Sequence, residues 1–249
     1  MPSQTAAIQW QQFLNKFQNT LWKVLDWIFP PFCPGCNKTG IRLCEDCRSS
    51  IRRISDPICP VCGEPGNDSS ICQDCLNYPP EFDRLRSAAL FDGVIRESLH
   101  RLKYNNDIGL GEILAPFLVE VSASQNWDID LVTSVPLSNE RLRMRGYNQA
   151  ECLAKPFAAM IGKLYAPSAI LRIKNTKSQI DLSAGERREN VSGAFYANSS
   201  QVVLKSVIII DDVSTTGSTI SECARALKLA GAKGVYALTL ARAPIRTDR

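Results

Sequence analysis

The sequence predicts an α/β fold, in which a parallel sheet with helices on both faces follows a small cysteine-rich zinc-ribbon module. Three observations predict it. Eight of ten cysteines form Cys-x-x-Cys pairs within residues 33–75, strand and helix patterns alternate after residue 81, and a β-branched run ends in two aspartates and a hydroxyl-rich turn. Alternating strands and helices favour a parallel, doubly wound sheet. With 249 residues, 45% apolar and 22% charged, the chain is not of the disordered or fibrous classes.

The first predicted element is an amphipathic helix within residues 1–30, stopped by Pro30 and Pro31. Its apolar residues recur at three- and four-residue spacing: Ile8, Trp10, Phe13, Leu14, Phe17, Leu21, Trp22, Leu25 and Ile28. Such a helix either makes a peripheral contact with a membrane or a partner, or packs on its own protein. We favour packing on its own protein, because Lys16 and Lys23 are too few for a basic membrane-binding face.

No segment reaches the roughly 20 apolar residues of a transmembrane span. The residues before Lys16 carry no positive side chain, and no compact apolar run with a cleavage site follows, so the sequence does not predict a secretory signal. We therefore expect a cytoplasmic protein. We expect three parts: the N-terminal helix (1–30), a double zinc-ribbon module (31–80) and an α/β domain (81–249), with the last boundary at the sequence Asn-Tyr-Pro-Pro of residues 77–80.

The four Cys-x-x-Cys pairs predict two structural zinc sites. The ligands are Cys33, Cys36, Cys44, Cys47, Cys59, Cys62, Cys72 and Cys75. Each pair can direct two sulfurs at one ion, and two pairs complete a tetrahedral site with no open position for catalysis. A disulfide framework is the alternative, but nothing in the sequence points to an oxidising compartment. Sequential pairing is favoured over crossed pairing, which spacing alone leaves open. Cys152 and Cys223 are interpreted as buried small residues.

After residue 81 the elements are expected in this order: strand 84–91, helices 94–103 and 112–121, strand 130–135, helix 149–161, strand 169–173, polar loop 174–188, strand 202–210, helix 218–230 and strand 235–240. The β-branched strand delivers Asp211 and Asp212 to its carboxyl end, where ligands bind in open α/β sheets. The turn that follows opens a helix, whose N–H groups suit a phosphate. Neighbouring carboxylates suit sugar hydroxyls and Mg²⁺. A ribose 5-phosphate fits this pattern.

The run VIIIDDVSTTGST of residues 207–219 resembles the signature of the type I phosphoribosyltransferases. With the zinc module, the resemblance narrows to the ComF family of competence-associated proteins. Further matching segments are LKY at 102–104, VPL at 135–137, RGYNQA at 145–150, KSQ at 177–179, LS at 182–183 and ERRENV at 186–191. This resemblance covers nearly all of residues 25–242, and the N-terminal helix lies outside it.

The resemblance implies a site for phosphoribosyl pyrophosphate (PRPP) and its Mg²⁺. Asp211 and Asp212 would bind the ribose hydroxyls. The 5-phosphate would be held by Thr215, Thr216, Gly217, Ser218 and Thr219. The diphosphate would lie against Ser134, Val135, Pro136 and Leu137, in the loop 134–138. Lys177 belongs to a later loop, 174–188, that would close over the site, and Arg187 and Arg188 are our choice for diphosphate contact, because guanidinium groups match phosphate oxygens.

Charge agrees with this assignment, since residues 138–190 contain ten Lys or Arg against five Asp or Glu. The same excess also fits a solvated surface or a nucleic-acid patch. Residues 1–80 are balanced, with seven of each sign, and so lack the footprint of an autonomous nucleic-acid binder. His100, the single histidine, lies on a predicted helix far from the motif and is not expected to be catalytic.

The motif and the resemblance together predict a PRPP-binding phosphoribosyltransferase-like protein that transfers a phosphoribosyl group to an acceptor the sequence does not identify. The resemblance to the ComF family implies that it acts in DNA uptake. The alternative is a non-catalytic accessory protein that binds single-stranded DNA or a DNA-uptake helicase and senses PRPP. A zinc-ribbon scaffold with a degenerate enzyme domain is disfavoured, because the acidic pair and the phosphate loop are intact.

Overall fold

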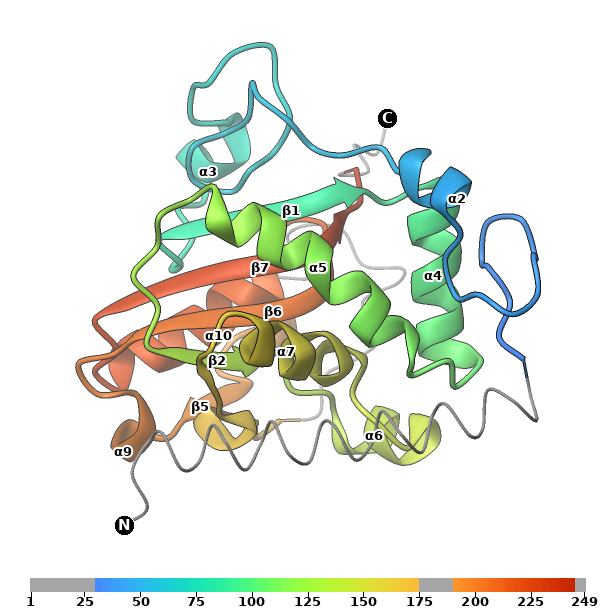
Figure 1. The fold of residues 1–249 in the computed structure, drawn as a ribbon. Coiled ribbons are helices and arrows are strands. Elements are labelled where there is room, and N and C mark those ends of the chain that lie inside the picture. The colour runs from blue at the N-terminus through green and yellow to red at the C-terminus, as the bar shows by residue number, and fades with distance from the viewer. Residues whose placement is uncertain (1–29, 175–189, 245–249) are drawn as a thin grey trace.

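A computed structural model describes residues 30–174 and 190–244 of the chain. At its centre is a five-stranded sheet of order β1-β7-β6-β2-β3, in which every neighbouring pair is parallel (Figure 1). These strands are β1 (Arg84–Leu90), β2 (Leu131–Ser134), β3 (Leu164–Tyr165), β6 (Ser206–Ser214) and β7 (Gly234–Arg242). The predicted parallel sheet is confirmed.

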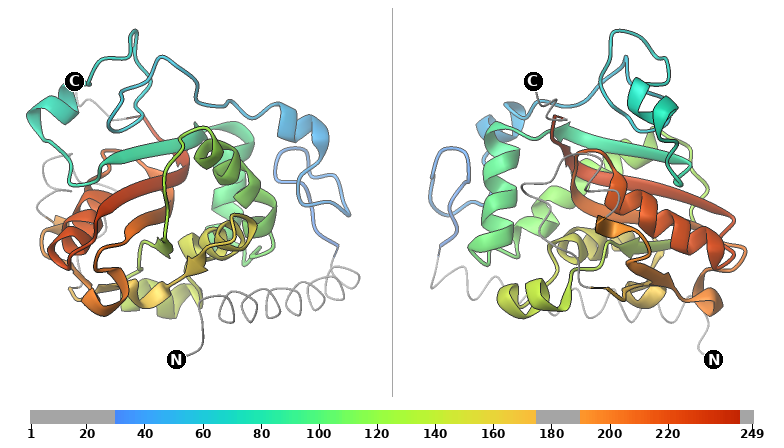
Figure 2. Two further views of the ribbon diagram at one scale, coloured as in Figure 1. Left: turned by 60° about the vertical axis from the view of Figure 1, so that its left-hand side comes forward. Right: turned by 180° about the vertical axis from the view of Figure 1, so that it is seen from behind.

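Helices cover both faces of the sheet, as the alternating sequence pattern predicts (Figure 2). The helices around the sheet are α4 (Gly93–Tyr104), α5 (Leu110–Ala123), α6 (Asn139–Arg145), α7 (Gln149–Met160), α9 (Ser199–Val202), α10 (Ser218–Leu229) and the short 3₁₀ helix η1 (Pro167–Ala169). The core on one face is formed with α4, α5 and α7. The core on the other face is formed with α10 and a small antiparallel pair, β4 (Ile170–Arg172) with β5 (Phe195–Ala197).

The central strand β6 explains why its sequence has no helical period. Ile208 and Ile210 belong to the core with α5 and α7, whereas Val207 and Ile209 belong to the core with α10. All four side chains are fully buried, because successive residues of a strand point to opposite faces and both faces are covered. The run therefore places the acidic residues that follow it on the middle strand of the sheet.

Several boundaries differ from the prediction. The β-branched strand begins at Ser206 rather than Val202, because Val202 ends α9 and Leu204 adopts a left-handed backbone with φ 58°. The same strand runs on to Ser214, so both aspartates lie within it. Helices α6 and α9 and strands β3 and β5 were not predicted, since each is only two to seven residues long.

The cysteine-rich part has two short helices, α2 (Glu45–Ser49) and α3 (Gln73–Asn77), which begin directly after Cys44 and Cys72 and contain the last cysteine of each set. The segments 1–29 and 175–189 lie outside the described residues, and with them the N-terminal helix and most of the polar loop 174–188. The division into parts at residues 30 and 80 stays a prediction.

Candidate functional site

The eight cysteines form two sets, each with its sulfurs within 4.8 Å of one another. The first set is Cys33, Cys36, Cys44 and Cys47, and the second is Cys59, Cys62, Cys72 and Cys75. Sulfur–sulfur distances of 3.5–3.7 Å match the edge of a tetrahedron, which is about 3.8 Å when each sulfur lies ~2.3 Å from zinc. The two sets fit two structural zinc ions, and the sequential pairing predicted from the sequence is confirmed.

The two ribbons repeat one backbone pattern. In the first, the Cys33 N–H donates to the Lys38 carbonyl at 2.9 Å, and in the second the Cys59 N–H donates to the Glu64 carbonyl at 2.8 Å. In each, the next knuckle also donates a backbone N–H to the first sulfur: Cys44 to Cys33 at 3.5 Å and Cys72 to Cys59 at 3.4 Å. Such bonds favour the thiolate form that zinc requires.

One thiol in each set is already easy to ionise. Burial opposes ionisation of Cys33, but backbone N–H groups directed at its sulfur outweigh burial and lower its pKa to about 6. The hydrogen bond from Cys75 and the positive charge of Arg242 together outweigh the opposing effect of burial and lower the pKa of Cys62 to about 5. Both sets are therefore chemically suited to a divalent metal.

The acidic pair lies at the carboxyl end of β6, between β2 and β7. Asp212 is buried, with 4% of its surface exposed, whereas Asp211 is partly exposed and lines the small cavity of the phosphate loop. The Asp211 carboxylate also accepts the backbone N–H of Asp212 at 2.9 Å. The Asp211 side chain thus faces the small cavity beside the loop, and the Asp212 side chain faces the interior of the protein.

Asp212 is held by a network from three other parts of the chain. Lys103, near the end of α4, forms an ion pair with its Oδ2 atom, and the Gln149 amide donates to Oδ1 at 3.3 Å. The guanidinium of Arg145 donates in turn to the Gln149 carbonyl oxygen. A buried carboxylate is stable only with such partners, so the network fixes where Asp212 points.

The two carboxyl groups titrate in opposite directions. Burial and the neighbouring charge of Asp212 raise the pKa of Asp211 well above its ordinary value. Burial acts against ionisation of Asp212 as well, but the charge of Lys103 and the hydrogen bonds from Lys103, Asp211 and Gln149 lower its pKa. Asp212 is therefore the member that keeps its charge without a ligand.

The turn after the acidic pair is shaped as a phosphate loop. Gly217 has φ +75°, a left-handed backbone that favours glycine, and it begins α10. The Thr216 and Ser218 hydroxyls lie 2.6 Å apart, and Thr215 and Thr219 line the same cavity. The hydroxyl of Ser214, which is 2% exposed, has no hydrogen-bond partner among the described residues. Donors thus gather at the N-terminus of a twelve-residue helix.

The loop 134–138 lies beside this turn at the same edge of the sheet. The Val135 N–H donates to the Ile210 carbonyl at 3.0 Å, directly before the acidic pair. The Asn148 amide donates to the Val135 carbonyl at 2.9 Å, and the Ser134 and Tyr165 hydroxyls share a hydrogen bond of 2.9 Å. Pro136 and Leu137 are partly buried between these anchors. The structure therefore brings the two predicted ligand loops together.

Lys177, Arg187 and Arg188 lie outside the described residues, so their predicted contacts with the diphosphate stay predictions. The sequence analysis missed Lys103, Gln149 and Arg145 as site residues, although all three belong to the segments 102–104 and 145–150 that resemble the ComF family. The resemblance to the ComF family therefore marked both segments. The residue types alone, however, gave no indication that the two segments meet at Asp212.

A cavity of about 410 Å³ lies beside Lys103. Phe91, His100 and Tyr104 contribute aromatic surface to its lining, together with Arg96 and Glu97. His100 is exposed, and its ring centroid is 5.0 Å from that of Tyr104. The sequence placed His100 far from the acidic motif, but the helix that carries it reaches Asp212 through Lys103.

Cys223 is fully buried in the core under α10, as predicted, and burial raises the pKa of its thiol. Cys152, on α7, is only partly buried, and burial with the nearby charge of Glu151 raises its pKa to about 12. Neither thiol is therefore activated as a nucleophile.

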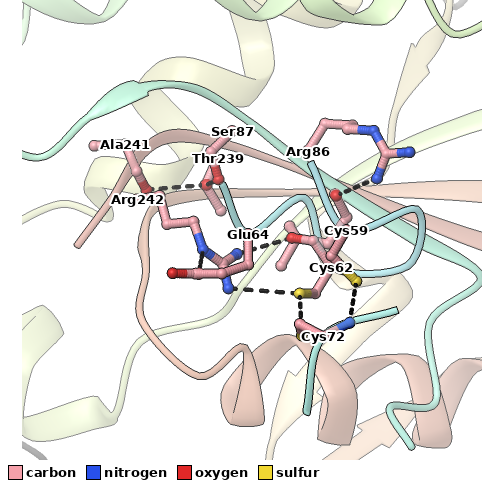
Figure 3. Close-up of polar contacts among 10 residues, drawn as sticks. Cys59, Cys62, Glu64, Cys72, Arg86, Ser87, Thr239, Ala241 and Arg242 are labelled. Carbon is pink, nitrogen blue, oxygen red and sulfur yellow. Dashed lines mark hydrogen bonds and ion pairs between the residues drawn. The ribbon is translucent and has the colours of Figure 1, made fainter. Parts of the chain in front are cut away.

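The second zinc ribbon packs against the end of β7 that lies beside the phosphate loop (Figure 3). Arg242, only 3% exposed, donates to the Cys62 carbonyl at 2.8 Å, approaches the Cys62 sulfur at 3.7 Å and forms an ion pair with Glu64. Its backbone pairs with Ser214, the last residue of β6. One arginine thus joins the metal ligands to the strand end where the phosphate loop begins.

Comparisons with known proteins identify a known domain in the cysteine-rich part of the chain and another in the α/β part. A double zinc ribbon domain matches residues 24–76, and a phosphoribosyl transferase domain matches residues 153–249. The DNA utilization protein YhgH of Salmonella typhi is 34% identical over 207 residues, which cover 80% of this chain and 90% of that protein. Competence protein F of Haemophilus influenzae is 30% identical over 212 residues, covering 81% and 90%. The chain belongs to the ComF family.

A further ComF family member, competence protein ComFC of Bacillus subtilis, is 29% identical over 222 residues, covering 82% of this chain and 86% of that protein. The phosphoribosyl transferase domain at residues 153–249 implies that the present chain binds a ligand of the PRPP type. In the part of the chain that the structure describes, no helix has the length and apolar character needed to cross a membrane.

Proposed function

We propose that this ComF family protein binds PRPP with Mg²⁺ and transfers the phosphoribosyl group to an acceptor during the use of incoming DNA. The observation that carries the proposal is the meeting of the acidic pair, the phosphate loop and the loop 134–138 at one edge of the sheet. The names of the relatives, DNA utilization protein and competence protein, support the process.

In this proposal Asp211 and Asp212 bind the ribose hydroxyls, and residues 215–219 hold the 5-phosphate. The loop 134–138, with Lys177, Arg187 and Arg188 from the segment beyond it, binds the diphosphate. The Ser214 hydroxyl, which has no hydrogen-bond partner within residues 30–174 and 190–244, supports a phosphate at this position, because a buried hydroxyl without a partner is unfavourable until a ligand satisfies it.

Magnesium fits the chemistry of Asp211 better than that of Asp212. Asp211 is partly exposed, whereas Lys103 already neutralises one oxygen of Asp212. Magnesium takes one or two carboxylates and keeps several waters, so Asp211 with the ligand's own oxygens would suffice to hold it. When bound, the ion would neutralise the diphosphate as it leaves C1 of the ribose.

This reaction needs no strong general base. Departure of the diphosphate places positive charge on the ribose ring, and the main task of the protein is to position the nucleophile and stabilise the separating charges. We place the acceptor in the 410 Å³ cavity beside Lys103, because Lys103 connects that cavity to the ribose-binding carboxylates.

A second candidate function is a non-catalytic accessory role, in which the protein binds single-stranded DNA or a helicase partner and PRPP is a sensed ligand. The relatives favour it in one respect, since their names state a process and no reaction. Acceptor-dependent release of diphosphate from PRPP would separate the two candidates, because a sensor binds PRPP without consuming it.

The first experiment is a calorimetric titration of the zinc-loaded full chain with PRPP, with and without Mg²⁺. We expect micromolar binding that requires Mg²⁺ and is abolished by Asp211→Asn combined with Asp212→Asn. Asp128→Asn is the matched control, because Asp128 is an exposed acid before the opposite end of β2. Unchanged affinity in the double variant would contradict the ligand assignment.

Ribose 5-phosphate and single-stranded DNA serve as parallel ligands in the same titration. Arg187→Ala with Arg188→Ala should weaken PRPP more than ribose 5-phosphate, because only PRPP carries the diphosphate. Equal losses would count against the proposed role of the two arginines, and DNA binding without PRPP binding would favour a nucleic-acid accessory built on a reused fold.

A further inference from the structure

A groove of about 640 Å³ lies outside the ligand site and is lined by residues of α5, α6, α7 and the turns beside them. Its apolar lining comes from Ile108, Leu142, Tyr147, Pro156, Ala159 and Met160. Met160 is 51% exposed and Leu142 is 42% exposed, although both are large apolar side chains. Contiguous exposed apolar surface of this kind marks a place where another element packs.

The described chain begins close to one end of this groove. The Phe32 carbonyl accepts a hydrogen bond from Arg101 at 2.6 Å, and Arg101 also pairs with Asp107 at 2.8 Å. Arg42 contacts the other oxygen of Asp107 at 3.1 Å. Asp107 immediately precedes Ile108 and Gly109, which line the groove. The residues before position 30 are therefore tethered next to the groove.

Those residues have a sequence that matches an apolar groove. Residues 8–28 carry apolar side chains at helical spacing, and as a helix they would extend about 30 Å, at 1.5 Å per residue. Lys16, Lys23 and Asp26 are the only charged residues among the first 29, so the opposite face is polar but almost neutral. Two acidic side chains, Glu112 and Glu151, lie in the groove lining, where Glu151 also pairs with Lys155 at 2.7 Å.

We propose that residues 8–28 form an amphipathic helix that binds in the α5–α6–α7 groove of the same chain and covers Leu142, Pro156 and Met160. A short tether gives an attached segment an effective concentration of the order of millimolar at its own groove, which favours it over a separate partner. The weak positive charge also disfavours a membrane surface as the occupant, since such helices carry a strongly charged face. This inference does not depend on PRPP binding.

Tryptophan fluorescence gives a direct test in the full chain. Three of the four tryptophans, Trp10, Trp22 and Trp27, lie in the segment, so Trp127→Phe leaves only segment reporters. We expect blue-shifted emission and weak quenching by acrylamide in this background. Adding Met160→Arg should shift the emission to the red and strengthen quenching, because a buried charge expels the helix from the groove.

Leu229→Arg is the matched control, since Leu229 is 77% exposed on α10 and does not line the groove. Leu142→Glu is a second groove variant, also at an exposed position. If the emission of the Trp127→Phe protein is already that of water-exposed tryptophan, or if both groove variants leave protected tryptophans unchanged, the proposal is wrong.

Photocrosslinking identifies the occupant independently. With p-benzoylphenylalanine in place of Phe17, we expect crosslinks within one chain to peptides from residues 139–160. Crosslinks to a second chain would show that copies exchange the segment or dimerise through it. Insertion into phosphatidylcholine–phosphatidylglycerol vesicles with loss of the intrachain crosslink would show a membrane-binding helix. Either result would overturn the proposal.

Discussion

The two zinc ribbons have the same local backbone but pack on different parts of the molecule. The first contacts α4, α5 and the turn between them: Arg101 of α4 donates to the Phe32 carbonyl at 2.6 Å, Arg42 pairs with Asp107 in the turn, and Arg48 pairs with Glu120 of α5 at 3.5 Å. The second contacts the sheet itself through Arg86 and Arg242, both at least nine-tenths buried. Identical metal-binding modules therefore stabilise a helical layer in one case and strand ends in the other.

This difference bears on the candidate ligand site. Arg242 links Cys62 to the strand end beside Ser214, and a side chain at Gly217 would meet Phe82 and Leu85, which belong to the core cluster of the second ribbon. Among the described residues, the first ribbon contacts α4, the helix that carries Lys103. We expect the second metal to be coupled to ligand binding more strongly than the first.

The largest expected effect comes from removing one zinc at a time, because the binding free energy of a structural zinc ion, roughly 10–16 kcal/mol in zinc-finger peptides, is folding free energy. Cys36→Ser and Cys62→Ser should each lower the zinc content from two ions to one, measured by elemental analysis of the purified chain. Because Cys62 contacts Arg242, its loss should weaken PRPP binding about tenfold, within the usual range of coupling between sites. Cys36→Ser should leave the affinity nearly unchanged. Equal effects on affinity would refute the distinction between the ribbons.

The second largest effect is expected at Arg242. Arg242→Met leaves Glu64 without its partner in a poorly solvated place, and breaking a buried pair costs about 3–5 kcal/mol of unfolding free energy. Arg52→Met is the control, because the Arg52 side chain is 67% exposed, so its ion pair with Asp92 is partly solvated and should contribute less than the buried pair of Arg242. Urea unfolding of both variants measures the difference. A loss at Arg242 as small as that at Arg52 would mean that the ribbon is held by backbone contacts alone.

Lys103→Met tests the contact between α4 and the acidic pair. Lys103 lowers the pKa of Asp212, so the pair stabilises the fold above the ordinary pKa of an aspartate, about 3.9, and this contribution is lost as the pH falls through the lower folded value. The variant should be less stable than the wild type at pH 7, and the deficit should persist down to about pH 4 and shrink below it, as Asp212 becomes protonated. Melting temperatures between about pH 2 and 8 measure it, and a deficit independent of pH would assign Lys103 a packing role only.

The sequence predicted those parts of the site whose residues lie close together along the chain. Each cysteine knuckle needs only four consecutive residues, and the strand, acidic pair and phosphate loop are contiguous from Val207 to Thr219. Their hydrophobic pattern and turn residues determine the geometry without reference to the rest of the chain. The zinc sets and the loop before α10 were therefore predicted correctly.

The contacts that were missed join distant segments. Lys103 and Asp212 are more than one hundred residues apart, as are Cys62 and Arg242, and no periodicity connects them. Helix α6 was missed for a different reason. Its seven residues contain none that is buried, so it has no apolar stripe, and its Ser138 cap and Gly146 end are signals that also fit a turn.

The smallest effect is expected on the outer surface of the first ribbon. Glu120 pairs with Arg48 at 3.5 Å and with Arg53 at 2.8 Å, but its side chain is 52% exposed, so Glu120→Gln should change the unfolding free energy by about 0–1 kcal/mol. Arg53→Ala should cost more, because it also removes the guanidinium from the Phe117 ring and the aliphatic stem that covers it. Urea unfolding in low and high salt separates the contribution of the ion pair with Glu120 from that of the contact with the Phe117 ring, since salt screens only the ion pair. If Glu120→Gln lowers the unfolding free energy more than Arg53→Ala does, the first ribbon is held to α5 by charge. The two ribbons would then differ in how exposed their charged contacts are, and not in the kind of contact they make.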